Sequence, residues 1–175
     1  NTSETLAEAI EAAQDGETIT LVDDVIIDSL LTLSGEEMDI TIDLDGHTLT
    51  STIAGTGGSI DLTDGASLTV MDGIIEANEC EKTNYSVVYI DTGCSFTLDQ
   101  VTFNSTGTPL APAGDAAQVN VRNGSVINAG AYCVATNAGK TDNYNVDINL
   151  ENSEFNASSA VFLNVPGTLN MDNCV

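Results

Sequence analysis

Carboxylates are the side chains in this sequence that could most readily carry chemistry. Asp43, Asp45, Asp61, Asp64 and Asp91 fall on neighbouring segments of the chain. Carboxylates that converge in a groove can hydrolyse a glycosidic bond, one as an acid and another as a base or nucleophile. Asp45 and Asp64 each precede a glycine, however, and Asp-Gly pairs commonly form turns. We therefore expect solvated and turn-forming aspartates here, and we assign no catalytic residue.

Calcium is the ion that the acidic residues favour, because it binds hard oxygen ligands. Asp43 and Asp45 are the candidate ligands, although the chain has neither the spacing of an EF-hand loop nor a nonapeptide calcium repeat. No other cofactor is expected. His47 follows Gly46 without a nearby serine, cysteine or second histidine, so we identify no catalytic triad.

The balance of charge restricts the partners. Lys and Arg number 3 and Asp and Glu 27, which gives a formal net charge of −24. Nucleic acids and anionic membranes require cationic contacts, so we expect neither as a partner. The sequence has no apolar run of the roughly 18 residues that a membrane span needs, and no recognisable signal peptide. Because the last repeat stops part-way, we expect the chain to be part of a larger polypeptide.

The sequence has four cysteines and does not determine whether they are free thiols or form a disulfide. None of them forms a CxxC pair, which argues against the usual zinc and redox sites. Buried thiols and one disulfide are both compatible with the spacing, and the sequence determines no pairing. The residues are Cys80, Cys94, Cys133 and Cys174.

Short repeated strands are the elements that must position these residues. Residues 68–77 read LTVMDGIIEA, with apolar residues at Leu68, Val70 and Ile75. Similar segments begin at Phe96, Val119, Ile148 and Leu169, and a looser one begins at Ile42. Spacings of about 20–30 residues are typical of stacked repeats, in which each unit buries its apolar face against its neighbours. The Asp-Gly pairs could form either hairpin turns or corners of a coil. The repeats favour the corners.

One position of the repeat carries an Asp or Asn in most copies. These residues are Asp72, Asn123, Asn152 and Asn173. Such residues tolerate a left-handed backbone and bond to neighbouring groups. They predict a structural ladder at one corner of successive coils rather than a ligand site.

An amphipathic helix is predicted before the first strand. Leu6, Ala9, Ile10 and Ala13 form one apolar stripe, and Gly16 is a natural stop. A helix in this place would cover the open end of the first coil. We predict a single domain over residues 1–175, with a cap helix in residues 3–16 and coils in residues 17–175 that continue in the natural protein.

The helix, the segment DGETITLVDDVII from Asp15 and the segment DITIDLDGHTLTS from Asp39 together resemble a known family. They are similar to the N-terminal part of right-handed parallel β-helix proteins of the pectate-lyase-like superfamily. The resemblance is closest to the non-catalytic, adhesin-like regions of large bacterial and archaeal surface proteins, and it covers essentially the whole chain. It implies an all-β fold, a right-handed parallel β-helix with one N-terminal capping α-helix. Lyases, hydrolases, adhesins and viral tailspikes share this fold.

Lyases of the superfamily are expected to combine acidic calcium ligands with a basic residue. The basic residues here are Lys82, Arg122 and Lys140, and the sequence pairs none of them with a carboxylate cluster. A polyanionic substrate would also be repelled by the net charge. Lyase activity is therefore not expected.

One row of outward residues is a candidate binding site. If alternate residues of the strand before each repeat point inward, the residues between them face solvent. The candidates are Asp61, Tyr89, Val134 and Phe162, with Tyr132 beside them. Aromatic side chains on a flat sheet can hold a glycan or a protein partner. The alternative is that a loop, such as residues 106–116 with Pro109 and Pro112, covers them.

We therefore expect an extracellular, surface-displayed module for adhesion or structural spacing. Its expected partner is a glycan or an extracellular protein. The alternatives are a polysaccharide-degrading enzyme of the same fold and a segment of a viral fibre or tailspike.

Overall fold

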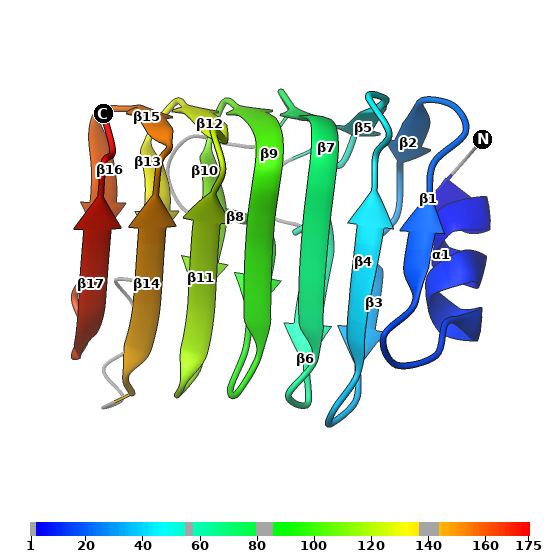
Figure 1. Ribbon diagram of the computed structural model, residues 1–175, viewed down its shortest axis with the longest axis horizontal. Helices are drawn as coiled ribbons and strands as arrows, with labels where there is room; N and C mark the ends of the chain where they lie inside the picture. The colour runs from blue at the N-terminus through cyan, green and yellow to red at the C-terminus, as the bar shows by residue number, and fades with distance from the viewer. Residues whose placement is uncertain (1–2, 55–57, 80–85, 137–143) are drawn as a thin grey trace.

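The computed structural model describes residues 3–54, 58–79, 86–136 and 144–175. It is a parallel β-solenoid that follows one short helix, so the predicted all-β fold is confirmed (Figure 1). Every pair of hydrogen-bonded strands in the described residues runs parallel, which makes the Asp-Gly pairs corners of a coil. No helix in the described part of the chain is long and apolar enough to cross a membrane.

A front sheet receives one strand from each successive coil and faces the viewer in Figure 1. Its strands stack in sequence order from the N-terminal end of the solenoid to the C-terminal end. They are β1 (Thr18–Thr20), β4 (Asp39–Asp43), β7 (Ser67–Ala77), β9 (Ser95–Ser105), β11 (Ala117–Arg122), β14 (Val146–Glu151) and β17 (Gly167–Asp172).

The chain then bends into a second, narrower side, which we call the upper face. The second halves of β7 and β9 belong to it, and they extend the hydrogen bonding of the front sheet around the corner. The shorter strands of the upper face are β2 (Val25–Ile27), β5 (Thr48–Ser51), β12 (Val126–Ala129) and β15 (Glu154–Asn156).

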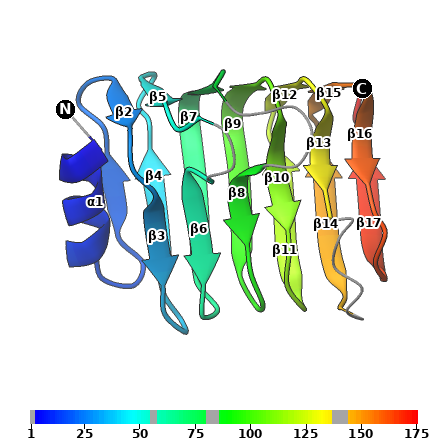
Figure 2. The same cartoon turned by 180° about the vertical axis from the view of Figure 1, so that it is seen from behind.

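A rear sheet closes each coil and is seen from its outer side in Figure 2. It contains β3 (Leu31–Ser34), β6 (Ile60–Thr63), β8 (Ser86–Ile90), β10 (Thr108–Pro112), β13 (Tyr132–Ala135) and β16 (Ser159–Phe162). In Figure 1 the front strands point up, the rear strands point down, and the chain advances from right to left. The coil is therefore right-handed.

Apolar residues fill the space between the sheets in straight rows. Leu68 pairs with Ile40 on one side and Phe96 on the other, and all three are at most 2% exposed. Because each strand repeats the alternation of its neighbour, every inward side chain lies on an inward side chain of the next coil. The predicted role of Leu68 as a member of an interior row is confirmed.

The corner between the front sheet and the upper face has a left-handed backbone. The predicted corner residues Asp72, Asn123, Asn152 and Asn173 have φ angles from 48° to 59°. Asp45 and Gln100 occupy the same corner in other coils, with φ angles of 46° and 57°. Short polar side chains adopt this conformation more readily than others, so the repeated Asx residues set the direction of the chain here.

Helix α1 (Ser3–Ala12) packs against β2 and β3 at the N-terminal end of the solenoid. Leu6 and Ile10 are 3% and 9% exposed and belong to the same core as the coils. The helix ends before the predicted limit, and Gly16 turns the chain into β1 with a φ of 78°.

Candidate functional site

The predicted outward row lies on the rear sheet and is present only in part. Asp61 of β6 pairs with Tyr89 of β8, which pairs with Ala111 of β10. At the C-terminal end, Phe162 of β16 pairs with Ala135 of β13. Asp61, Tyr89 and Phe162 are all half-buried on this side of the sheet.

The prediction that Val134 faces outward is wrong. Val134 pairs with Leu110 and Val161, and Leu110 in turn pairs with the inward Val88. The Val134 side chain is 0% exposed. Strict alternation from the buried Cys133 suggested the opposite, but β13 buries two adjacent residues. The Cys133 thiol lies 3.7 Å from the carbonyl oxygen of Ile127, which belongs to the preceding strand β12. Val134 occupies the inward row of the rear sheet, next to Leu110.

The alternative, that residues 106–116 cover this row as a loop, is wrong. Residues 106–116 do not fold over the sheet as a loop, because their middle part is strand β10, between β8 and β13. Prolines in a strand normally argue against a central position, and Pro109 and Pro112 concealed this one. All residues of β10 are buried, including Ala111 at 3% exposure in the outward row. The row is thus divided into two patches, one on each side of β10.

The first patch consists of Tyr132 and Phe162. Their ring centroids are 5.2 Å apart and the rings are tilted by 37°. Tyr132 begins β13 and Phe162 ends β16, so two consecutive coils bring these rings together. Both residues are half-buried, which leaves aromatic surface available to a ligand.

The second patch consists of Asp61 and Tyr89, with Asp91 nearby. The Tyr89 ring lies over Gly58, where an added Cβ would come within 2.8 Å of the ring. Burial, and then the charge of Asp91, raise the pKa of the Asp61 carboxyl above its ordinary value. Asp91 also accepts a hydrogen bond from the backbone N–H of Thr92 at 2.7 Å. The charge of Asp91 thus acts on the Asp61 carboxyl, and Asp61 is paired with Tyr89 of the next strand.

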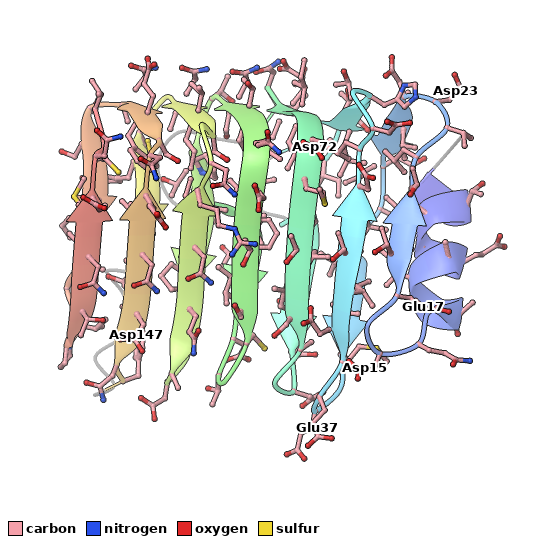
Figure 3. The ribbon with its side chains drawn as sticks, in the orientation of Figure 1. Asp15, Glu17, Asp23, Glu37, Asp72 and Asp147 are labelled. Atoms are coloured by element: carbon pink, nitrogen blue, oxygen red, sulfur yellow. The ribbon has the colours of Figure 1, made fainter. Side chains whose placement is uncertain are left out.

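The other candidate carboxylates lie elsewhere. Asp43 and Asp45 are at the corner between the front sheet and the upper face, on the opposite side of the coil from Asp61. Asp64 accepts a hydrogen bond from the Ser34 hydroxyl at 2.6 Å. Figure 3 shows acidic side chains distributed over the solenoid, with Asp72 near the upper corner and Asp147 low on the front sheet.

The calcium candidates have a structural explanation in the corner itself. The Asp43 carboxylate accepts a hydrogen bond from the backbone N–H of Asp45 at 2.9 Å. This bond is typical of a turn around an aspartate. Within the described residues, no three His, Cys, Asp or Glu side chains are placed to hold a metal ion.

The remaining reactive groups are separate from the rear sheet patches or lie outside the described residues. Cys94 and Cys133 are buried free thiols, and Cys174 is a half-buried free thiol. Burial raises the pKa of Cys133 to about 12. Arg122 pairs with Asp99 on the front sheet at 2.8 Å. Cys80, Lys82 and Lys140 lie outside the residues that the structure describes.

Rows of bonded amides on the outer surface were missed by the sequence reasoning. On the front sheet, Asn170 donates to Asn149, and Asn149 donates to Asn120. On the upper face, Asn156 donates to Asn128, and Asn128 donates to Asn104. The sequence signal for these amide rows is a polar residue that lies between two apolar residues at the same position of each repeat.

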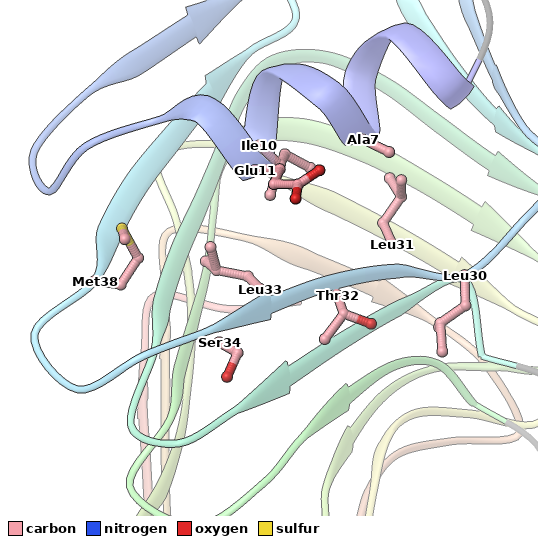
Figure 4. Close-up of a pocket in the computed structure, with 9 residues that line it drawn as sticks. All are labelled: Ala7, Ile10, Glu11, Leu30, Leu31, Thr32, Leu33, Ser34 and Met38. Carbon is pink, nitrogen blue, oxygen red and sulfur yellow. The ribbon is translucent and has the colours of Figure 1, made fainter.

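A groove beside the cap helix was also missed. It has a volume of about 380 Å³ and lies between α1 and β3 (Figure 4). Apart from Glu11, Thr32 and Ser34, its lining is apolar, and no charged groups converge in it. The lining residues are Ala7, Ile10, Glu11, Leu30, Leu31, Thr32, Leu33, Ser34 and Met38.

The geometry establishes a right-handed parallel β-solenoid with two half-buried aromatic patches on its rear sheet. Comparison of the chain with protein-family models, with curated proteins and with solved structures gave no match.

Proposed function

We propose that this chain is an extracellular, surface-displayed adhesion and spacer module whose rear sheet binds a neutral glycan. It would belong with the non-catalytic, adhesin-like β-helices of the pectate-lyase-like superfamily. The observation that carries the proposal is the pair of half-buried rings, Tyr132 and Phe162, on the same sheet as Tyr89.

Aromatic rings of this kind bind the apolar faces of sugars, while the Tyr hydroxyls and the Asp61 carboxyl can bond to sugar hydroxyls. Tyr89 and Phe162 lie on strands β8 and β16, with β10 and β13 between them. Strands in a sheet are about 4.8 Å apart, so the two patches are separated by about 14 Å across the sheet. This separation suits an extended oligosaccharide better than a single sugar.

The charge of the chain supports a neutral ligand. A net charge of −24 disfavours uronate polymers and other polyanions through long-range repulsion. The continuous stack of coils supports the spacer role, because in the described residues a single core runs from α1 to the last coils.

Binding of neutral oligosaccharides to an array, followed by titration calorimetry of the best ligand, tests the proposal. We expect Tyr132→Ala and Phe162→Ala each to weaken binding at least about tenfold, a loss of about 1.4 kcal/mol. Ile74→Ala, on the upper face and 37% exposed, is the matched control and should bind as the wild type does. The proposal would be refuted if no neutral glycan bound, or if both aromatic variants bound the glycan as tightly as the wild type does.

A glycoside hydrolase is the second candidate, because the charge of Asp91, which directly follows β8, acts on the Asp61 carboxyl of β6. A raised pKa suits a general acid, and an ionised neighbour could act as a base or nucleophile. Release of reducing ends from a bound oligosaccharide, abolished by Asp61→Asn and Asp91→Asn, would favour the hydrolase. Binding without turnover would favour the adhesion module, and a stable trimer in light scattering would favour a fibre segment.

A further inference from the structure

The groove beside the cap helix combines an apolar floor with an exposed apolar side chain. Figure 4 shows α1 on one side of the groove and β3 on the other. Ile10, Leu31 and Leu33 are the buried part of its lining, whereas Leu30 is 50% exposed. Its volume of about 380 Å³ lies in the lower part of the range of ligand pockets, which is about 300–1,000 Å³. The groove is therefore large enough to receive side chains of a ligand.

This groove is a boundary between two packed elements rather than an uncovered face of a coil. Helix α1 contacts both β2 and β3, and it buries Leu6 and Ile10 in the core of the solenoid. The helix thus already covers the apolar interior at this end of the stack. The groove is the space that the helix leaves open alongside β3.

Carboxylates border the groove on its helical side. Glu11 lines the groove, and Glu8 lies three residues earlier on the same face of α1. Both residues are exposed. In the described part of the chain, the cation Arg122 pairs with Asp99 on the front sheet, away from this helix. No cationic side chain is among the residues that line the groove.

Carboxylates also border the opposite side of the groove. Ser34 and Met38 line it, and the turn between them contains Glu36 and Glu37. The Ser34 hydroxyl donates a hydrogen bond to Asp64 at 2.6 Å, which brings a third carboxylate to the end of β3. All three acidic residues are exposed, and Figure 3 shows Glu37 at the lower end of the first coils. An apolar floor thus lies between two acidic sides.

From this arrangement we propose that the groove binds a basic segment of a partner protein. Aliphatic side chains of the segment contact Leu30, Ile10 and Met38, and its lysine or arginine side chains lie against the carboxylates on both sides. Charges on two sides of an apolar floor suit a polypeptide that carries several cations, because a single small cation could reach only one side. The net charge of −24 also attracts a basic partner over a long range.

The charges argue against the other occupants of such a groove. A second copy of this chain would bring the same net charge of −24 to the same carboxylates. An uncharged apolar ligand would use the floor and gain nothing from the two acidic sides. The site is also separate from the aromatic patches of the rear sheet, so it does not depend on the binding of a glycan.

A short, capped peptide of alternating lysine and leucine with a fluorescent label is the probe. One control peptide has serine in place of each leucine, and a second has glutamate in place of each lysine. Fluorescence anisotropy measures the affinity, and amide shifts in NMR spectra locate the bound peptide. Sedimentation velocity of the protein alone reports on self-association. We expect the lysine-leucine peptide to shift the amides of Glu11 and of β3, and both control peptides to bind at least about fivefold more weakly.

Leu30→Ser tests the apolar part of the site. It removes the exposed apolar side chain of the groove and should weaken binding of the lysine-leucine peptide at least about fivefold. Ile26→Ser is the matched control, because Ile26 is also 50% exposed and does not line the groove. It should bind the peptide as the wild type does.

The double variant Glu11→Gln, Glu36→Gln tests the acidic sides. It removes one carboxylate from each side and should weaken binding at least about threefold, as expected for exposed charge pairs. The control variant Glu79→Gln, Glu154→Gln removes the same charge from exposed residues outside the groove and should bind as the wild type does.

Several results would overturn the proposal. It fails if the lysine-leucine peptide does not bind, or if either control peptide binds equally well, since charge or apolar contact alone would then be sufficient. It also fails if the groove variants bind the peptide as their control variants do, because the peptide would then lie elsewhere on the acidic surface. A dimer of the protein alone that Leu30→Ser abolishes would identify the occupant as a second copy and would equally contradict the proposal.

Discussion

Leu68 and Thr69 are neighbours in β7 with opposite surroundings. Leu68 lies in the core between Ile40 and Phe96 and is 2% exposed. Thr69 points outward and pairs with Thr41 and Thr97 in a row that continues with asparagines. The same substitution at the two positions therefore separates the effect of burial from that of strand propensity.

Leu68→Asn should lower the free energy of unfolding by about 3–5 kcal/mol, because it leaves a cavity and buries an amide without a partner. Thr69→Asn should change it by less than about 1 kcal/mol. Urea unfolding followed by circular dichroism measures both values. Equal effects would contradict the register of β7.

The protonation of Asp61 is coupled to the stability of the fold. Burial and Asp91 raise its pKa, so the folded protein holds the Asp61 proton more tightly than the unfolded chain does. The stability from this proton is complete below the unfolded pKa of about 3.9. It is lost as the pH rises through the raised folded pKa.

Asp61→Asn should therefore increase the free energy of unfolding near neutral pH, because the asparagine cannot ionise. The gain should shrink as the pH falls through the folded pKa of Asp61 and vanish at a pH of about 3. Urea unfolding at a series of pH values measures this profile. Asp23→Asn removes the same charge from an exposed site and serves as the control. An equal gain from Asp23→Asn would show that reduction of the net charge alone is responsible, and a gain that does not change with pH would show that ionisation of Asp61 is not its cause.

At the scale of the elements, the corner after each front strand decides how the coil closes. Gly73 follows the left-handed Asp72, and a Cβ there would lie 2.5 Å from Cβ of Leu44 and 2.6 Å from the carbonyl oxygen of His47. The corner thus combines a left-handed residue with close contact to the preceding coil. A side chain at Gly73 would separate the two coils.

Asn123 tests the left-handed part of the corner. Asn123→Ala removes the hydrogen bond to Asp99, which is 2.7 Å long, and keeps a φ of 59° that alanine disfavours. We expect a loss of about 2–4 kcal/mol from the bond and the strain together. Asn123→Gly should lose about 1–2 kcal/mol less, because glycine accepts this backbone. Equal losses in thermal or urea unfolding would mean that the left-handed corner contributes no strain.

At the scale of the whole molecule, the main features are the net charge and the helix at the N-terminal end of the coils. The chain has a net charge of −24, and Figure 3 shows acidic side chains distributed over the described part of the solenoid. Arg122 is paired to Asp99. Repulsion among the carboxylates lowers the stability of the folded state. The helix covers the N-terminal end of the stack.

Raising NaCl from about 0.01 M to about 0.5 M should raise the melting temperature, because the Debye length falls from about 30 Å to a few ångströms. A gain on the order of 5 °C is expected. Scanning calorimetry with EDTA present measures the gain and excludes divalent ions as its cause. A melting temperature that is flat or falls with salt would show that repulsion does not limit stability.

The sequence alone determined the alternating strands, the stacked repeat, the cap helix and the Asx corner. These features depend on local preferences and on a short repeat, which residues such as Leu68, Asp72 and Asn123 display directly. The tertiary structure alone decided which residues share a row and which carboxylates meet. It placed Val134 in the core, made residues 108–112 the central strand β10, and brought Asp61 close to Asp91 rather than to Asp43. The reason is that row membership depends on the register between coils that are about 20–30 residues apart, and a shift of one residue exchanges the inner and outer faces.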